Sequence, residues 1–281
     1  MSDIASPAAQ ARAVLRANAA EWLGVVGRRR SRRSYDGIPV EPWELERLEQ
    51  LLERWRPYPD ARAVLVAEPP DDVFTGIVGS YGKVRHAPHV LVFLADHGTD
   101  FGDQHVGYTG EAVILEATRL GLATCWIGGF FNARNAADMV SLRPGERVLA
   151  VSPLGYSVRR PTFSERTMAG LAGAHHRKPV LELAPDTDRA HWPAWAVAAV
   201  ETARLAPSAM NRQPWRFRFE GGGLVLAKDN FVETPRVTKR LDIGIAMLHV
   251  ELAAAAHDVD GAWTDLSGAD VARFDPVVAP D

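Results

Sequence analysis

Five arginines and one serine fill the consecutive positions from Arg28 to Arg33. Guanidinium groups this close together repel one another unless an anion lies among them. The planar arginine side chain suits a phosphate group, and Ser31 adds a hydroxyl donor. The run is therefore either a small-molecule phosphate site or a solvated basic face of the kind that also binds nucleic acid.

A short polar turn between two prolines is the second candidate. Pro207 and Pro214 fix the backbone on either side of it. Ser208 and Asn211 offer a hydroxyl and a carboxamide, and amides that both donate and accept match the mixed edge of a flavin or a nucleobase. A helix stop followed by an N-cap also explains Ser208 and the prolines, but it leaves Asn211 and Gln213 without a role.

Adjacent glycines, Gly128 and Gly129, stand between bulky residues and form the third candidate. Without side chains they allow the backbone to approach a flat ligand closely. A strand end that turns through two glycines into a core aromatic is equally compatible with the pattern. Cys125, in an apolar run with no neighbouring base, is typical of a core thiol.

Several other patterns fail as signatures. Lys83 resembles the lysine that ends a phosphate-binding P-loop, but Ile77 and Val84 occupy positions that require glycine and a hydroxyl residue. No Gly-x-Gly-x-x-Gly fingerprint of a nicotinamide-binding Rossmann site occurs, and no histidines or acidic residues have metal-ligand spacing. An anion site and an amide-bearing turn without a protein nucleophile are typical of an enzyme whose cofactor carries the chemistry. We therefore expect neither a metal nor a catalytic side chain.

Alternating helices and strands must position these residues. Apolar residues recur at helical spacing in several segments, and short apolar runs or alternating residues indicate strands elsewhere. This succession indicates a mixed α and β protein whose parts pack closely together. The predicted helices cover residues 8–26, 42–57, 110–120, 193–205 and 245–257, and the predicted strands cover residues 62–67, 89–95 and 147–154, with a hairpin over 216–228.

A faint internal repeat accompanies this pattern. Gly110 begins an apolar helix that leads to Trp126, and Gly244 begins another that leads to Trp263. The two spacings differ, at 16 and 19 residues, so the pattern is suggestive of a duplication and does not fix its register.

Composition narrows the class of protein further. The chain has 281 residues, a net charge of −3 and one cysteine, which leaves no internal disulfide and no long-range attraction to nucleic acid or anionic membranes. Charged residues interrupt the N-terminal stretch where a secretion signal needs an apolar run, and no segment has the roughly 18 apolar residues of a membrane span. We expect a cytoplasmic protein that binds neither nucleic acid nor membrane.

The basic run from Arg29 to Tyr35, followed by Pro39-Val40, resembles the N-terminal signature of the FMN-dependent nitroreductase family. Residues 206–215 resemble the second signature of the same family. The resemblance implies an α+β (mixed α/β) nitroreductase fold, with a mixed sheet flanked by helices, that binds FMN. Further matches to the family core lie at residues 87–93, 110–126 and 154–156.

The order of the two signatures departs from the ordinary family pattern. In dimeric members, each flavin site takes the arginine signature from one subunit and the Pro-Ser-x-x-Asn turn from the other; here the two lie in different halves of one chain. The chain therefore resembles the tandem subgroup, which implies a degenerate tandem duplication that forms an intrachain pseudo-dimer. We expect residues 1–180 to carry the arginine signature and residues 181–281 to form a shortened half with the Pro-Ser-x-x-Asn signature, in a monomer or a dimer.

The resemblance also assigns cofactor contacts to single positions. The arginine signature would bind the phosphate and ribityl chain, with Arg33 and Lys83 at the pyrimidine edge of the ring. The glycine pair would offer N–H groups near the reactive flavin nitrogen, and the turn of the second half would reach the ring and ribityl chain. Either Arg177 or Lys178 would add a phosphate contact. The predicted cofactor-binding residues are Arg29, Arg30, Ser31, Arg33, Lys83, Gly128, Gly129, Arg177, Pro207, Ser208 and Asn211.

The activity that the resemblance implies is a ping-pong reaction in which NADH or NADPH reduces FMN and leaves before a small electron acceptor enters the same pocket. A nitroaromatic, a quinone or a similar molecule would be the acceptor, and FMN rather than a side chain would carry out the hydride transfer. The alternative is a flavin-binding carrier or regulatory protein without reductase turnover.

Overall fold

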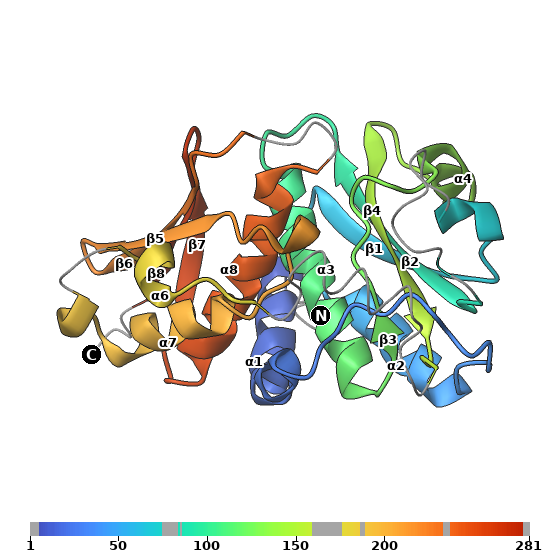
Figure 1. Ribbon diagram of the computed structural model, residues 1–281, viewed down its shortest axis with the longest axis horizontal. Coiled ribbons are helices and arrows are strands. Elements are labelled where there is room, and N and C mark those ends of the chain that lie inside the picture. The colour runs from blue at the N-terminus through green and yellow to red at the C-terminus, as the bar shows by residue number, and fades with distance from the viewer. Residues whose placement is uncertain are drawn as a thin grey trace, which may run out of the picture.

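Two four-stranded antiparallel sheets stand at opposite ends of the protein, with helices between them (Figure 1). The structure is a computed structural model that describes residues 6–74, 84, 86–158, 176–185, 189–232 and 237–277. The first sheet has the strand order β1-β2-β4-β3, and the second has the order β5-β6-β8-β7. The strands are β1 (Ala61–Ala67), β2 (His89–Asp96), β3 (Ala123–Thr124), β4 (Glu146–Gly155), β5 (Trp215–Glu220), β6 (Gly223–Lys228), β7 (Gly261–Asp265) and β8 (Asp270–Pro276).

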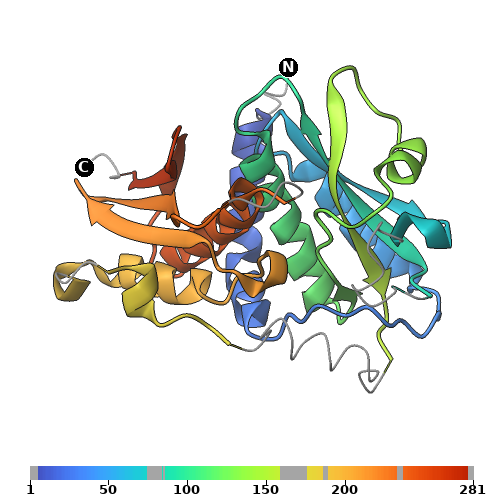
Figure 2. The same ribbon diagram turned by 45° about the horizontal axis from the view of Figure 1, so that its top comes forward.

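Helices α1, α3 and α8 form the layer between the sheets, as Figures 1 and 2 show. Helix α3 is buried along nearly its whole length, which confirms the burial that its apolar pattern predicts. The longer helices are α1 (Pro7–Val26), α2 (Pro42–Arg54), α3 (Gly102–Arg119), α7 (Ala194–Ala203) and α8 (Lys239–Ala255). The shorter ones are α4 (Ala133–Asp138), α6 (Val180–Leu183), η1 (Asp71–Phe74), η2 (Arg189–His191) and η3 (Ala209–Asn211).

Capping residues set where the helices begin. Ser6 caps α1 directly before Pro7, and Thr238 caps α8 by accepting a hydrogen bond from the N–H of Leu241. This cap explains why α8 begins at Lys239 and not near residue 245, where apolar spacing alone puts its start. Of the helices that the structure describes, none has both the length and the apolar run that crossing a bilayer requires.

The predicted α+β class is confirmed. The longer elements overlap the predicted ranges, but α3 begins at Gly102 and α8 at Lys239, both earlier than the starts predicted at residues 110 and 245. Strands β3, β7 and β8 are not predicted. β3 has only two residues, and β7 and β8 contain only short apolar stretches, Ala262-Trp263 and Val271-Ala272. An isolated parallel bridge between Ser31 and Thr124 adds a parallel neighbour to the otherwise antiparallel first sheet, so the pairing at that edge is mixed.

The two sheets are built by the same succession of elements. In each, a pair of antiparallel strands is followed by a long helix and then by two more strands, and the strands take up the same order. This is the arrangement expected of a tandem duplication; the boundary near residue 180 stays a prediction. Gly107 of α3 corresponds to Gly244 of α8, since Trp126 and Trp263 follow these glycines at equal spacing. Gly110, which the sequence pattern pairs with Gly244, instead leaves room for the Trp126 ring: a Cβ there would lie 2.5 Å from it.

The repeats meet where α3 crosses α8 at Gly107 and Gly244. A Cβ atom added to Gly107 would lie 2.2 Å from the carbonyl oxygen of Leu241, and one added to Gly244 would lie 1.9 Å from that of Gln104. Both contacts are with backbone, which cannot rotate away as a side chain can. The helices therefore touch through their main chains, and only glycine fits at either position.

Replacing Gly107 or Gly244 with alanine should force α3 and α8 apart. We expect each variant to lose about 3 kcal/mol or more of unfolding free energy, because overpacking against rigid backbone is strongly unfavourable. Urea unfolding measures the loss. Gly24→Ala is the matched control, since a Cβ on this helical glycine meets nothing within 4 Å; it should be neutral or stabilising by up to about 1 kcal/mol. Equal midpoints for Gly244→Ala and the control would contradict the packing.

Candidate functional site

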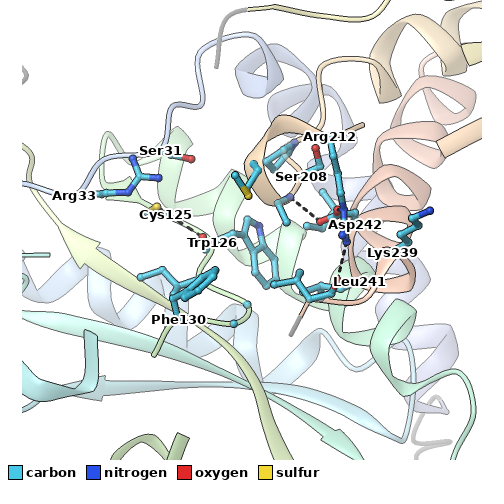
Figure 3. Close-up of a pocket in the computed structure, with 18 of the residues that line it drawn as sticks. Ser31, Arg33, Cys125, Trp126, Phe130, Ser208, Arg212, Lys239, Leu241 and Asp242 are labelled. Atoms are coloured by element: carbon cyan, nitrogen blue, oxygen red, sulfur yellow. Dashed lines mark hydrogen bonds and ion pairs between the residues drawn. The ribbon is translucent and has the colours of Figure 1, made fainter. Parts of the chain in front are cut away.

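A cavity of about 670 Å³ opens between the two repeats. Its volume lies within the roughly 300–1,000 Å³ that is usual for small-ligand and cofactor sites. Figure 3 shows Ser31 and Arg33 on one side, Arg212 and Asp242 on the other, and Trp126 between them. The first repeat lines it with Ser31, Arg33, Phe74, Val84 and residues 125–130, and the second with residues 207–210, Arg212, Asp229, Phe231, Val232, Val237, Lys239, Leu241, Asp242 and Ile245, together with Lys178.

The segment Ser31–Tyr35 runs beside β3 and carries part of the basic run to the cavity. The N–H of Arg32 donates to the carbonyl of Thr124 at 2.9 Å, and the buried Tyr35 donates its hydroxyl to the carbonyl of Arg32 at 2.9 Å. Alternate residues of an extended chain point to opposite sides. Ser31 and Arg33 therefore line the cavity, whereas the guanidinium of Arg32 donates to backbone outside it.

Three arginines gather beside the cavity without an acidic partner among the described residues. Arg29 is 7% exposed, and its guanidinium makes one hydrogen bond within the described residues, a 3.5 Å contact with Ser31 Oγ. Burial lowers the pKa of Arg29, and the buried carboxylate of Glu111 opposes this effect. Burial and the charges of Arg29 and Arg30 lower the pKa of Arg177 to about 10.

None of these three guanidinium groups forms an ion pair with a carboxylate in the part of the chain that the structure describes. No ion pair within the described residues neutralises the positive charge here, although the buried carboxylate of Glu111 acts on Arg29. An anion with several oxygen acceptors, such as a phosphate group, would neutralise it and use the free donors.

The turn after α7 has an unusual backbone. Met210, Asn211 and Gln213 have φ angles of 50°, 56° and 47°, in the left-handed region that disfavours residues with side chains. The hydroxyl of Ser208 accepts a hydrogen bond from the N–H of Gln213 at 2.9 Å and closes the turn. Pro207 and Ser208 consequently face the cavity from the second repeat.

Asp242, in the first turn of α8, ties this turn to the helix. Its carboxylate accepts the N–H of Ala209 at 3.0 Å and pairs with Nε of Arg212 at 2.7 Å. Burial raises the pKa of Asp242 to about 6, although Arg212 and the Ala209 N–H favour the charged form. The sequence pattern does not predict this residue, because it starts the helix too late; an acidic residue in the first turn after the Thr238 cap is the signal that could reveal it.

The glycine pair Gly128-Gly129 lines the cavity opposite the start of α8. A Cβ on Gly128 would lie 3.2 Å from side-chain atoms of both Leu241 and Val237, so a larger residue would narrow the space between the repeats. Trp126 leads into the pair, and its indole N–H donates to the buried Glu111 at 2.7 Å. The main chain thus reaches the cavity wall at the place that the sequence predicts.

Asn211 and Arg177 lie apart from the cavity lining. The carboxamide of Asn211 accepts a hydrogen bond from Arg177 and donates to the carbonyl of His176. Arg177 and Lys178 are the two alternatives predicted for a further phosphate contact. Arg177 lies in the arginine cluster, whereas Lys178 lines the cavity and pairs with Glu182 at 2.8 Å.

The predicted cofactor-binding residues thus fall into three groups. One of them, Lys83, lies outside the described residues. Cys125, which is predicted as a core thiol and not as a cofactor-binding residue, is buried and also lines the cavity. Those that line the cavity are Ser31, Arg33, Gly128, Gly129, Pro207 and Ser208, and those of the neighbouring cluster are Arg29, Arg30, Arg177 and, through its bond to Arg177, Asn211.

The position that corresponds to this cavity in the order of elements is occupied by closely packed side chains. Counted from the two crossing glycines, His105 corresponds to Asp242, and Asp265 corresponds to Gly128. A carboxylate therefore stands where the open cavity has a glycine. The repeats are equivalent in topology and different at this position in what they can bind.

His105 joins the repeats at the filled position. Its Nδ1 lies 2.7 Å from Asp60 and its Nε2 lies 3.0 Å from Asp265, while its ring stacks on Tyr58 with centroids 3.8 Å apart. Burial alone would lower the pKa of His105, but its hydrogen bonds to Asp265 and Asp60 raise the pKa above the ordinary value. The imidazole and the two carboxylates satisfy one another's hydrogen bonds, so this cluster needs no ligand.

The chain matches the family described as "Putative TM nitroreductase" over residues 23–254, and it belongs to this nitroreductase family. It is similar to the crystal structure of "a putative nitroreductase" from Thermotoga maritima MSB8, with a TM-score of 0.55 and 23% identity over 90% of this chain and 92% of that one. That structure shares its fold, which confirms the fold predicted from the sequence.

Other solved structures match about half of the chain. A nitroreductase with bound FMN from Bacteroides fragilis NCTC 9343 has 19% identity and a TM-score of 0.39, over 51% of this chain and 91% of that one. A structure described as a "Putative NADH Oxidase" from Clostridium acetobutylicum has 21% identity and a TM-score of 0.39, over 49% of this chain and 89% of that one. No match was found among curated proteins.

The His105 cluster should make stability depend on pH. Because the pKa of His105 is raised in the folded protein, its ion pairs contribute fully below the unfolded value and are lost as pH rises through the folded value. His105→Gln should therefore destabilise the protein more at about pH 5.5 than at about pH 9, as measured by urea unfolding. His97→Gln, at an exposed histidine, should show no such difference. An equal loss for His105→Gln at both pH values would rule out a charged cluster.

Proposed function

We propose that this protein is an FMN-dependent oxidoreductase in which the two repeats share one flavin site. NADH or NADPH is the proposed electron donor, and a nitroaromatic, a quinone or a similar small molecule is the proposed acceptor. One observation carries the proposal: Arg29, buried and without a carboxylate partner in the described chain, lies beside a largely apolar cavity between the repeats. Membership of a nitroreductase family supports it.

The arginine cluster fits the phosphate end of FMN. Arg29, Arg30 and Arg177 would hold the phosphate, since charge-assisted hydrogen bonds from guanidinium groups are among the strongest in proteins. Burial and repulsion from neighbouring arginines lower the pKa of Arg177, and the anion would offset both effects. Ser31, between the cluster and the cavity, offers its hydroxyl to the ribityl chain.

The cavity fits the ring end. Trp126, Phe130 and Pro207 offer apolar surface to a flat ring, and the Gly128-Gly129 main chain offers N–H groups without side-chain obstruction. Arg33 would face the pyrimidine edge, where its positive charge favours negative charge on the ring. The residues present therefore suit both ends of the cofactor.

When bound, FMN supplies the hydride-transfer chemistry that no side chain of the site offers. The protein binds and orients the cofactor, and its apolar walls exclude water from the ring. The proposed reaction is ping-pong, because donor and acceptor would use the same open side of one cavity. The proposed partners are small molecules, and the proposed assembly is a monomer or a dimer.

The visible absorption spectrum of the purified protein, with released flavin counted per chain, tests the proposal. About one FMN per chain, reduced under anaerobic conditions by NADH or NADPH and reoxidised by a quinone, is the expected result. A flavin that neither nicotinamide reduces would make the protein a carrier and not a reductase. Absence of bound flavin, even after FMN is added, would overturn the proposal.

Arg29→Gln should weaken FMN binding. Loss of one hydrogen-bonded charge at a buried site corresponds to roughly 10- to 100-fold in the dissociation constant. Titration of apoprotein with FMN, followed by flavin fluorescence, measures it. Arg28→Gln is the matched control, because Arg28 is the exposed neighbour in the same basic run and should leave the constant within about 2-fold. Equal constants for Arg29→Gln and the control would remove Arg29 from the site.

A further inference from the structure

The carboxamides of Asn211 and Gln213 hold the chain around Arg177 against the turn that carries them. Asn211 donates to the carbonyl of His176 at 2.8 Å and accepts a hydrogen bond from Nη1 of Arg177. Gln213 accepts the N–H of Lys178 at 2.9 Å and donates to the carbonyl of His176 at 3.2 Å. We call these two side chains the amide clamp.

Gln213 is the buried member of the clamp, and Asn211 is half-buried. Gln213 is 1% exposed, so a lost partner would leave a polar group unsatisfied away from water. The N–H of Gln213 donates to Ser208 Oγ at 2.9 Å, which connects the clamp to a residue of the cavity wall. Both clamp residues have a left-handed backbone, which disfavours most side chains and is tolerated best by glycine and asparagine.

Arg177 occupies a position that electrostatics disfavours. Its guanidinium donates to Asn211 and to the carbonyl of Leu205, the latter at 3.2 Å, and it lies close enough to Arg29 and Arg30 for their charges to lower its pKa. An unrestrained arginine would turn its charged end to water and away from like charges. The clamp supplies the restraint, and an anion would supply the missing neutralisation.

We propose that Asn211 and Gln213 are positioning residues that fix Arg177 in the anion site, and that they act on the phosphate of the cofactor through Arg177 without contacting the cofactor themselves. The identification of the cofactor rests on the proposed function; the clamp applies to any ligand that carries a phosphate group there. A turn of the second repeat thus orients an arginine of the anion site, most of which belongs to the arginine signature of the first repeat. As a result, the site binds a flavin that has a phosphate more tightly than one that lacks it.

FMN and riboflavin provide the test, because they share ring and ribityl chain and differ in the phosphate. Apoprotein is titrated with each flavin, and the ratio of the two dissociation constants isolates the contribution of the anion site. The variants are Asn211→Asp, Arg177→Gln and their combination. Aspartate keeps the shape of asparagine and tolerates a left-handed backbone, but its charge would neutralise Arg177. Gln50→Ala, at an exposed amide of α2, is the control.

Both single variants should weaken FMN binding by roughly 10- to 100-fold and change riboflavin binding by less than about 2-fold. The double variant should be no weaker than Arg177→Gln by more than about 2-fold, because both changes act through one group. Equal weakening of FMN and riboflavin by Asn211→Asp would show direct contact with the shared part of the cofactor and overturn the inference. Additive losses in the double variant would overturn it as well.

A separate experiment distinguishes failure of the proposed function from failure of the amide clamp. If the wild-type protein binds neither flavin, the proposed function fails, and the same variants are then compared for stabilisation by inorganic phosphate alone in a thermal unfolding assay. Stabilisation that Arg177→Gln and Asn211→Asp both remove, and that Gln50→Ala retains, would support the clamp. Stabilisation that Asn211→Asp leaves intact would overturn it.

Discussion

Main-chain contact between α3 and α8 at Gly107 and Gly244 sets the distance between the two repeats. Helices that pack through side chains stay further apart, and the separation varies with the residues at the contact. Here backbone meets backbone, so the separation is fixed. Asp242 and Ile245 flank Gly244 on α8 and line the cavity, so the same contact fixes one wall of the site. A cavity shared between repeats needs such a constraint to keep a constant width.

One crossing produces two different environments because the charges around it are balanced differently. At the filled position, His105 and the carboxylates of Asp60 and Asp265 satisfy one another. At the open position, Arg29 and its neighbouring arginines have no carboxylate partner in the described chain, and a glycine takes the place of a carboxylate in the wall. Where the side chains of a cluster neutralise one another, the cluster is structural. Where positive side chains have no acidic partner, an anion can bind to them.

The sequence predicts the elements of the site better than their contacts. The basic run, the polar turn and the glycine pair are local patterns, and each lies beside the cavity. The bond from Arg177 to Asn211 and the pair between Arg212 and Asp242 join residues far apart in the chain, and no local pattern encodes them. The predicted register of the repeat is wrong because the pattern pairs Gly110 with Gly244; the equal spacing to Trp126 and Trp263 indicates Gly107 instead, and the close approach of α8 to Gly107 agrees with it.

The turn after α7, which borders the cavity, contains features that lower the stability of the folded protein. Its left-handed residues are intrinsically unfavourable. The raised pKa of Asp242 means that the folded protein binds that proton more tightly than the unfolded chain does. Stability therefore falls as pH rises from the unfolded value through about 6, so the ionised carboxylate is destabilising where it lies. Strained backbone and a buried charge occur together beside the open cavity, which is where proteins retain such features for function rather than for folding. The strain keeps Ser208 at the cavity wall and Asn211 on Arg177.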